Sequence, residues 1–283
     1  MDTITYPVHG AGLGLRRAFI GPLLEKPPSH VDFYEIVPEN WIRIGGNYGK
    51  QLRALTEQFS FVAHGLSLSI GSPDPLDIEF IHDIRDFIKQ HQIKIYTEHL
   101  TYCSDGGHLY DLMPIPFTQE AVNYVADRIT QVQDILGEQI AIENASYYAA
   151  PGKEMEEIDF INAVIKKADC KLLIDINNIY VNSVNHQYNA EAFLKNLPGD
   201  RISYAHIAGH YNEAEDLIID SHGAKVIDPV WQLLDKAYEN FGLFPTLLER
   251  DFNIPPLDDL LEEVDLIHQA QLKYTPQQKH AAG

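Results

Sequence analysis

The chain has 283 residues, of which 45% are hydrophobic and 22% are charged, a composition typical of a folded globular protein. It carries 41 acidic and 21 basic residues, which gives a formal net charge of −20 at pH 7. So acidic a surface repels phosphate backbones, and we therefore expect no broad nucleic-acid binding. No apolar run reaches the roughly 18 residues that a bilayer requires, so we expect no membrane-spanning segment.

The amino terminus does not resemble a secretory signal. Asp2 stands where such a signal has Lys or Arg, and no apolar core follows it. The two cysteines, Cys103 and Cys170, are too few for a disulfide framework and form no Cys-x-x-Cys pair. We therefore expect a cytoplasmic protein with reduced thiols.

Short apolar runs rich in β-branched and aromatic residues alternate along the chain with longer segments of helical periodicity. Eight runs are predicted as strands: 12–16, 33–37, 61–64, 94–98, 139–143, 171–175, 202–207 and 245–249. Helices are predicted at 76–90, 118–136, 155–168, 189–197, 229–240 and 256–270. The helices after the first and sixth strands are weakly indicated, because Pro27 and Pro28 interrupt the first and the segment 189–197 is short.

Eight strand–helix units in a chain of this length predict one (β/α)8 barrel that forms a single domain over residues 1–283. The tail from about Lys273 is expected to fray. The alternative is an open doubly wound sheet, which often carries a Gly-rich phosphate loop after its first strand. The glycines between Gly10 and Gly14 precede and enter the strand instead of opening a helix, which disfavours that fold.

Side chains that bind metals follow six of the predicted strands. The carboxyl ends of barrel strands converge on one mouth, where the active sites of such enzymes lie. Asp220 and His222 lie in the loop after the seventh strand, and in an extended segment they would point to the same side. The residues at the strand ends are His64, Glu98, His99, Glu143, Asn144, Asp175, Asn177, Asn178, His206, His210 and Glu249.

Each of these residues has a simpler explanation when it is taken alone. A single His at a strand end is often a hydrogen-bonded structural residue, an acidic residue at the rim often caps a helix, and Asn177 and Asn178 suit a turn. Together, so many ionisable groups facing one cavity would repel each other without cations. We therefore predict a polynuclear metal site, and ligands of this kind without thiolate suit zinc, manganese or non-haem iron.

In its ligand order the chain resembles the trinuclear-zinc apurinic endonucleases of the endonuclease IV type, which belong to the xylose-isomerase-like barrels. In this chain Asn178 stands where that pattern has a third-site His. The resemblance implies three ligand sets: His64, His99 and Glu143 for one ion, Glu143, Asp175, His206 and Glu249 for the second, and Asp220 with His222 for the third.

In local sequence the chain resembles the multinuclear non-haem iron-dependent oxidative enzymes, the family of the methanobactin-biosynthesis oxidase. The matching segments span most of the chain. They are GLGLR (12–16), FYEIVPEN (33–40), HGLSLSIG (64–71), EHL (98–100), ENA (143–145), DINNIYVN (175–182), HIAGH (206–210), DSH (220–222) and LERD (248–251).

This second resemblance implies a barrel that holds two or three irons, activates dioxygen and oxidises residues, typically cysteines, of a ribosomally made precursor peptide. A separate partner protein would help to present the peptide. Asn178 would be an oxygen ligand of the third ion, and His210 a ligand, a proton shuttle or a support for a ligand. Arg16, Glu35, Asn40 and Asn144 would orient ligands or substrate, or Arg16 and Glu35 would form a structural ion pair.

Three other functions compete with this one. A zinc-dependent phosphodiester hydrolase of the endonuclease IV type fits the ligand order, but Asn178 and the net charge of −20 count against it. A sugar isomerase would rely on a Lys that is missing from the predicted strand ends. A metal-stabilised module that binds a partner peptide is the alternative without catalysis.

Overall fold

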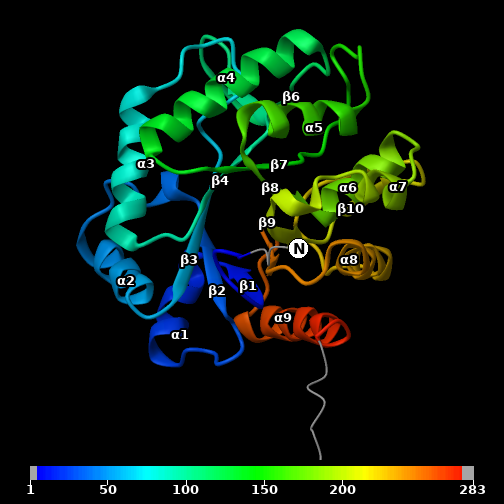
Figure 1. Ribbon diagram of the computed structural model, residues 1–283. Coiled ribbons are helices and arrows are strands. Elements are labelled where there is room, and N and C mark those ends of the chain that lie inside the picture. The colour runs from blue at the N-terminus through cyan, green and yellow to red at the C-terminus, as the bar shows by residue number, and fades with distance from the viewer. Residues whose placement is uncertain (1–4, 276–283) are drawn as a thin grey trace, which may run out of the picture.

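The computed structural model describes residues 5–275 and shows eight parallel strands that close into a barrel (Figure 1). The strands follow one another around the barrel in the order β1-β12-β9-β8-β7-β4-β3-β2. This closed sheet confirms the predicted (β/α)8 barrel. The barrel strands are β1 (Ala11–Gly14), β2 (Phe33–Ile36), β3 (Ser60–Gly65), β4 (Tyr96–His99), β7 (Ala141–Glu143), β8 (Lys171–Asp175), β9 (Ile202–Ile207) and β12 (Thr246–Leu248).

Helices surround the barrel, and their ends follow from local chemistry. The Asp77 side chain accepts a hydrogen bond from the backbone N–H of Phe80 and so caps α3, while Gly137 ends α4 in the left-handed conformation. The helices are α1 (Ile20–Glu25), α2 (Gly46–Thr56), α3 (Ile78–His91), α4 (Gln119–Leu136), α5 (Glu157–Ala168), α6 (Ile176–Asn185), α7 (Ala190–Lys195), α8 (Asp228–Phe241) and α9 (Leu257–Leu272).

Two apolar layers hold the barrel together. Because parallel strands are buried on both faces, their sequences are continuous apolar runs, as the prediction assumed. One layer packs the strands against the surrounding helices. The other fills the amino-terminal half of the barrel interior and includes Phe33, Val62, Leu173, Tyr204 and Leu247. With this end filled by side chains, the polar residues at the opposite ends of the strands form the floor of the mouth.

Two helices differ from the sequence prediction. Helix α2 was not predicted, because the glycines at its start hide its periodicity. Helix α6 begins directly after β8, so Asn177 and Asn178 lie in a helix and not in a turn. Its capping residue is Asp175, whose side chain accepts a hydrogen bond from the Asn178 N–H at 2.6 Å. One predicted metal ligand therefore also fixes the start of the helix that carries another.

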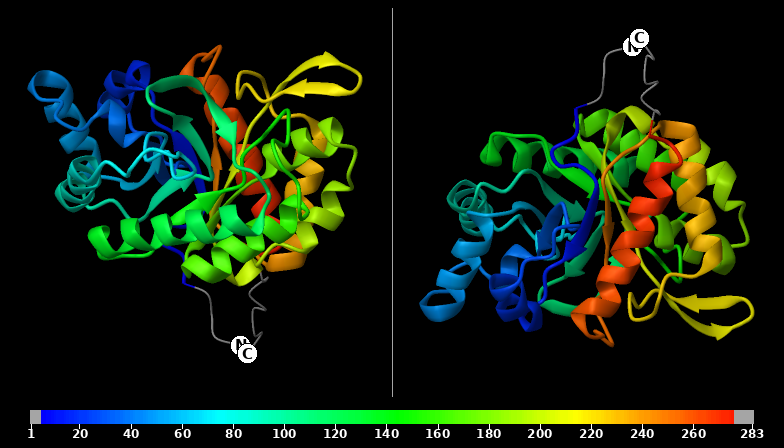
Figure 2. Two further views of the ribbon diagram at one scale, coloured as in Figure 1. Left: turned by 90° about the horizontal axis from the view of Figure 1, so that it is seen from above. Right: turned by 90° about the horizontal axis from the view of Figure 1, so that it is seen from below.

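Two hairpins were also missed by the sequence prediction. One pairs β5 (Thr101–Ser104) with β6 (His108–Pro114), and the other pairs β10 (Tyr211–Ala214) with β11 (Leu217–Ile219). Figure 2 shows both hairpins at one end of the barrel, the end opposite the first and last described residues. They follow β4 and β9 in the chain, so they flank the mouth at the carboxyl ends of the strands.

The first residues of the tail expected from Lys273 contact helix α8. The Lys273 ammonium pairs with Asp235 at 2.7 Å, and the Tyr274 ring lies 5.7 Å from the ring of Tyr238. The chain therefore stays packed against α8 through residue 274, and the rest of the expected tail, 276–283, lies outside the described residues.

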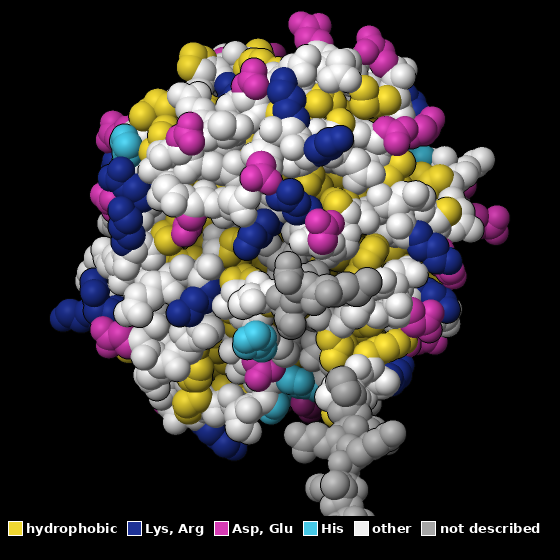
Figure 3. Space-filling model, viewed as in Figure 1, with side chains coloured by type: hydrophobic (Ala, Val, Ile, Leu, Met, Phe, Trp, Pro, Cys, Tyr) yellow, Lys and Arg dark blue, Asp and Glu magenta, His cyan; other side chains and the backbone are white. Residues whose placement is uncertain are grey.

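On the face that Figure 3 shows, Lys and Arg side chains lie interspersed with Asp and Glu. Within residues 5–275, no helix is both long enough and apolar enough to cross a bilayer.

Gly12 tests the packing inside the barrel. In Gly12→Ala the new Cβ would lie 2.5 Å from the Phe33 ring, which is fully buried. We expect a loss of about 1–3 kcal/mol in the free energy of unfolding, measured by urea denaturation. The matched control is Gly107→Ala, where the added Cβ meets nothing within 4 Å and stability should change by less than about 0.5 kcal/mol. Equal stability of the two variants would contradict this account.

Candidate metal centre

The first group of predicted ligands lies where β3, β4 and β7 end side by side. The Nε2 atoms of His64 and His99 lie 3.2 Å apart, and each is within 3.4 Å of Glu143 Oε2. His99 Nδ1 lies 2.8 Å from the Gly65 carbonyl, which only accepts, so this nitrogen carries the proton. The Nε2 lone pair of His99 therefore points at the other two atoms, as a shared cation would require.

The second group centres on the fully buried His206 at the end of β9. Its Nε2 donates to Glu35 Oε2 at 2.9 Å, and this carboxylate also accepts from the Tyr204 hydroxyl. Its Nδ1 is therefore left facing Glu249 at 2.9 Å and Glu143 at 3.1 Å. The fourth member, Asp175, is also fully buried. Glu143 thus belongs to both groups and is placed to bridge two ions.

The third group forms around His222, whose two ring nitrogens each face carboxylates. On one side His222 Nε2 lies 2.8 Å from Asp220 Oδ1, and on the other Nδ1 lies 3.2 Å from both Glu249 and Asp251. Asp220 and His222 contact each other, as predicted from their spacing. However, His222 has a φ of 46°, so the prediction that this segment is extended is wrong. Asp251 was not predicted as a ligand, although it lies only two residues after Glu249.

Asn178 fits the role of an oxygen ligand. Its Nδ2 donates to the Asn144 carbonyl at 3.1 Å, and its backbone N–H donates to Asp175. Its Oδ1 is buried, lacks a hydrogen-bond partner among residues 5–275, and belongs to a side chain that lines the mouth. A buried oxygen without a donor is costly unless a cation satisfies it.

Protons must neutralise these groups when no metal does. Burial disfavours the charged form of His64, yet the Glu143 carboxylate outweighs it and raises the pKa of His64 to about 9. Burial also raises the pKa of Asp175 to about 8. For His206 the nearby Glu35 and Glu249 outweigh burial and hold the pKa well above its usual range. Metal ions would displace these protons, which is the behaviour of imidazole and carboxylate ligands.

The three residues predicted as catalytic lie around the ligands. Asn144 donates to the Asp175 carbonyl and accepts from the Asp175 N–H, both at 2.9 Å, so it fixes the end of β8. His210 Nδ1 bonds Asn177 Oδ1 at 2.7 Å, and the Asn177 amide donates to Asp220. Both therefore contact residues that hold the ligand sets together, and their catalytic role stays a prediction.

Arg16 lies at the rim of the mouth. Its guanidinium pairs with Asp251 and donates to the Arg250 carbonyl, whereas Glu35 bonds Tyr204 and His206. The alternative of an Arg16–Glu35 ion pair is therefore wrong. Arg16 holds the segment after β12, and Glu35 sets which nitrogen of His206 faces the ligands.

A cavity of about 450 Å³ opens above the ligands. His99, Glu143, Asn178, Asp220 and His222 line it. Its walls include the apolar or aromatic side chains of Leu66, Leu112, Tyr148 and Phe252.

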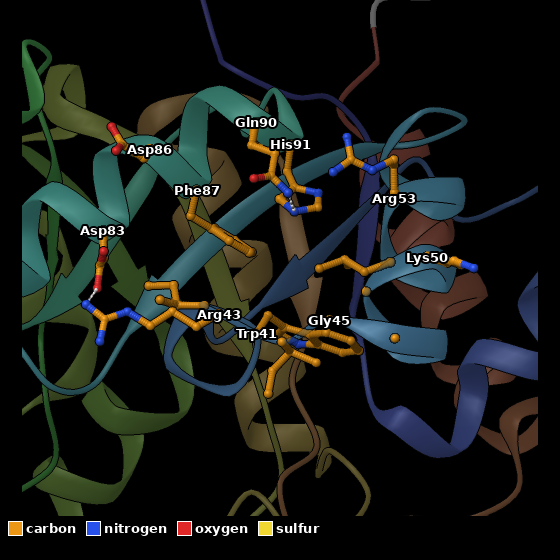
Figure 4. Close-up of a pocket in the computed structure, with 15 residues that line it drawn as sticks. Trp41, Arg43, Gly45, Lys50, Arg53, Asp83, Asp86, Phe87, Gln90 and His91 are labelled. Carbon is orange, nitrogen blue, oxygen red and sulfur yellow. Dashed lines mark hydrogen bonds and ion pairs between the residues drawn. The ribbon is translucent and has the colours of Figure 1, made fainter.

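A cavity of about 500 Å³ lies outside the barrel, between α2 and α3, and Figure 4 shows its lining. There Arg43 reaches Asp83 at 2.6 Å beside the Trp41 and Phe87 rings. Its lining residues include none of the three ligand groups, so the chemistry belongs to the mouth.

Fold and site together define a xylose-isomerase-like TIM barrel with a cluster of candidate metal ligands at its mouth. A family model described as RiPP precursor modification enzyme MbnB/TglH/ChrH matches residues 10–272. The chain belongs to this family, and membership indicates an enzyme that modifies a precursor peptide.

Close relatives share almost the full length of the chain. A UPF0276 protein of Alcanivorax borkumensis is 60% identical over 278 residues, which cover 95% of this chain and 93% of the relative. A UPF0276 protein of Shewanella sediminis is 59% identical over 260 residues, which cover 92% and 94%.

Solved structures resemble the chain in fold alone. A zinc-bound IOLI protein aligns with a TM-score of 0.62 at 16% identity, over 95% of this chain and all of the other. A xylose isomerase domain protein of Planctomyces limnophilus aligns with a TM-score of 0.59 at 14% identity, over 95% and 98%. Both share the barrel fold of this chain.

Removal of a single ligand tests the first two groups. His64→Ala and Glu249→Ala should each lower the metal bound per chain, because each removes a donor from a buried set, while the far-UV circular dichroism stays unchanged. His108→Ala, which removes an exposed His from the β5–β6 hairpin, is the control and should keep its metal. Unchanged metal content in both ligand variants would refute the assignment.

The third group is tested by a double substitution. Replacement of Asp220 and His222 together by Ala should remove one metal equivalent and leave the rest, because the other two groups lie on the barrel strands. Elemental analysis of the purified variant measures this. Full retention of metal would show that no third ion binds there.

Proposed function

We propose that this protein is a multinuclear iron-dependent oxidase, which holds two to three iron ions and uses dioxygen to modify residues, above all cysteines, of a ribosomally made precursor peptide. The observation that carries the proposal is the convergence of buried imidazole and carboxylate lone pairs in a member of a precursor-modifying family. Neither ligand group on the strands includes a thiolate, and such donor sets suit iron as well as zinc or manganese.

Each ion would have a defined set of protein ligands. His64, His99 and Glu143 would hold the first, and Glu143, Asp175, His206 and Glu249 the second. Asp220, His222 and Asn178 would hold the third. When bound, iron would supply redox chemistry with dioxygen and would make a peptide thiol easier to deprotonate.

The surrounding residues would set the geometry of these ligands. Glu35 keeps the proton on His206 Nε2, and the Gly65 carbonyl keeps the proton on His99 Nδ1, so each ring offers one defined lone pair. Asn144 and His210 would position Asp175 and Asp220, and Arg16 would hold the rim around Asp251. Asn144 contacts Asp175 directly, whereas His210 would act on Asp220 through Asn177.

The peptide would approach through the cavity between the two hairpins. Leu66 and Phe252 line this cavity and are 39% and 64% exposed. The mouth therefore offers exposed apolar surface that a peptide could contact. A separate partner protein would present the peptide there. We place the reaction in the cytoplasm, where thiols stay reduced. Both cysteines of the chain are free and buried, so neither would compete with the thiol of the substrate.

A trinuclear-zinc hydrolase of phosphodiesters is the second candidate. The ligand order and the zinc bound by the IOLI protein favour it. In such an enzyme the ions would activate water and stabilise the leaving oxygen. The net charge of −20 disfavours a nucleic-acid substrate.

Metal content decides between the two candidates. Protein made anaerobically in iron-supplemented medium should contain two to three irons per chain in a coupled cluster, detected by Mössbauer spectroscopy. Dioxygen uptake should rise with a synthetic cysteine-bearing peptide and not with its serine counterpart, because only a thiol binds iron strongly once deprotonated. Zinc at the same ratio despite abundant iron would favour the hydrolase, and protein without metal would contradict both.

A further inference from the structure

A third cavity, of about 270 Å³, lies outside the barrel between α5, α7 and the segment that joins α6 to α7. Its walls include two stacked pairs of rings. Tyr147 and His186 lie 4.0 Å apart at an interplanar angle of 14°, and Tyr188 and Phe193 lie 5.1 Å apart at 18°. Aromatic rings grouped in this way attract cations through their electron-rich faces.

A buried carboxylate belongs to the same lining. Glu157, the first residue of α5, is only 7% exposed. Its Oε1 accepts from Asn182 Nδ2 at 3.3 Å, and its Oε2 lacks a hydrogen-bond partner within the described chain. Lys153 at the edge of the cavity pairs with Glu156 at 2.7 Å and acts on Glu157 only from beyond ion-pair distance. An ionised group this deeply buried is costly unless a cation accompanies it.

We propose that this cavity binds an alkylammonium group, which places its charge beside Glu157 and its methylene groups against the Tyr147 and Tyr188 rings. An ammonium group combines a cation–π attraction with a charge pair, and the alkyl part removes apolar surface from water. A simple metal cation fits less well, because it prefers several oxygen ligands, whereas here rings form much of the lining.

The cavity is connected to the loop that leads from β7 to the mouth. Asn182 donates to the Ala145 carbonyl at 3.0 Å as well as to Glu157, and its Oδ1 accepts from the Tyr147 N–H. The next residue, Tyr148, lines the mouth above the ligands. An occupant would therefore sit beside the entrance. If the proposed function holds, a lysine of the peptide substrate is one source of the ammonium group, and a free amine is the other.

Binding should depend on pH through Glu157. Burial raises the pKa of Glu157 to about 8, although Tyr147, Asn182 and Lys153 act in the opposite direction. A bound cation favours the ionised form, so affinity should rise from pH 7 to pH 9, a range in which an alkylammonium group with a pKa of about 10.4 stays charged. The other titratable side chains lining the cavity are Lys153, Glu156, His186, Tyr147 and Tyr188.

Isothermal titration calorimetry on the metal-loaded full chain tests the proposal. The probes are Nα-acetyl-lysine amide and n-butylammonium, with Nα-acetyl-norleucine amide as the neutral match of the first. We expect saturable binding of an ammonium probe and none of the norleucine derivative. Glu157→Gln should weaken binding about tenfold or more and abolish its rise with pH. Glu191→Gln, which removes the same charge from the exposed face of α7, should change neither.

The outcomes distinguish a polypeptide lysine from a free amine as the source of the ammonium group. They also distinguish failure of this proposal from failure of the proposed oxidase function. Binding of the lysine derivative alone indicates a polypeptide lysine, and binding of both ammonium probes indicates the amine itself. Tyr188→Leu should also weaken binding, while His64→Ala, with a damaged metal centre, should bind as the wild type does. The proposal is overturned by equal binding of the norleucine derivative, by unchanged affinity in Glu157→Gln, or by loss of binding in His64→Ala.

Discussion

The central constraint on this structure is the mutual repulsion of buried imidazole and carboxylate lone pairs at the mouth of the barrel. His206 Nδ1 faces Glu249 and Glu143 within 3.1 Å, and His99 Nε2 faces Glu143 at 3.2 Å, and all four side chains are largely buried. Such groups can stay together only with protons or metal ions between them. The filled amino-terminal half of the barrel supplies the rigid base that holds them in place despite this cost.

Strand register brings the ligands together. His99 pairs with Glu143 across β4 and β7, and Asp175 pairs with His206 across β8 and β9. Register also places Thr97 opposite His64, where its hydroxyl lies 2.7 Å from Nδ1 and orients the ring. A parallel barrel thus supplies the ligands and the groups that orient them from neighbouring strands.

The loops after the strands contribute further candidate ligands. Asp220 and His222 lie beyond the barrel, and Asp220 is held there by the Ser146 hydroxyl at 2.7 Å and the Asn177 amide at 2.9 Å. The two hairpins extend the walls of the mouth. Loops on a rigid scaffold are where related enzymes vary their substrates. The aromatic cavity around Glu157 lies among these connecting segments, and none of the candidate metal ligands lines it.

The sequence by itself determined the barrel and the candidate ligands on its strands, because apolar runs and the residues that end them are local features that need no partner to be recognised. Helix α2 and the two hairpins were not predicted from the sequence, because glycine-rich segments and short exposed segments have weak hydrophobic periodicity. Only the tertiary structure decided that Arg16 pairs with Asp251, that Glu35 fixes His206, and that His222 faces two sets of carboxylates. These contacts join residues far apart in the chain, and their distances depend on how the whole barrel closes.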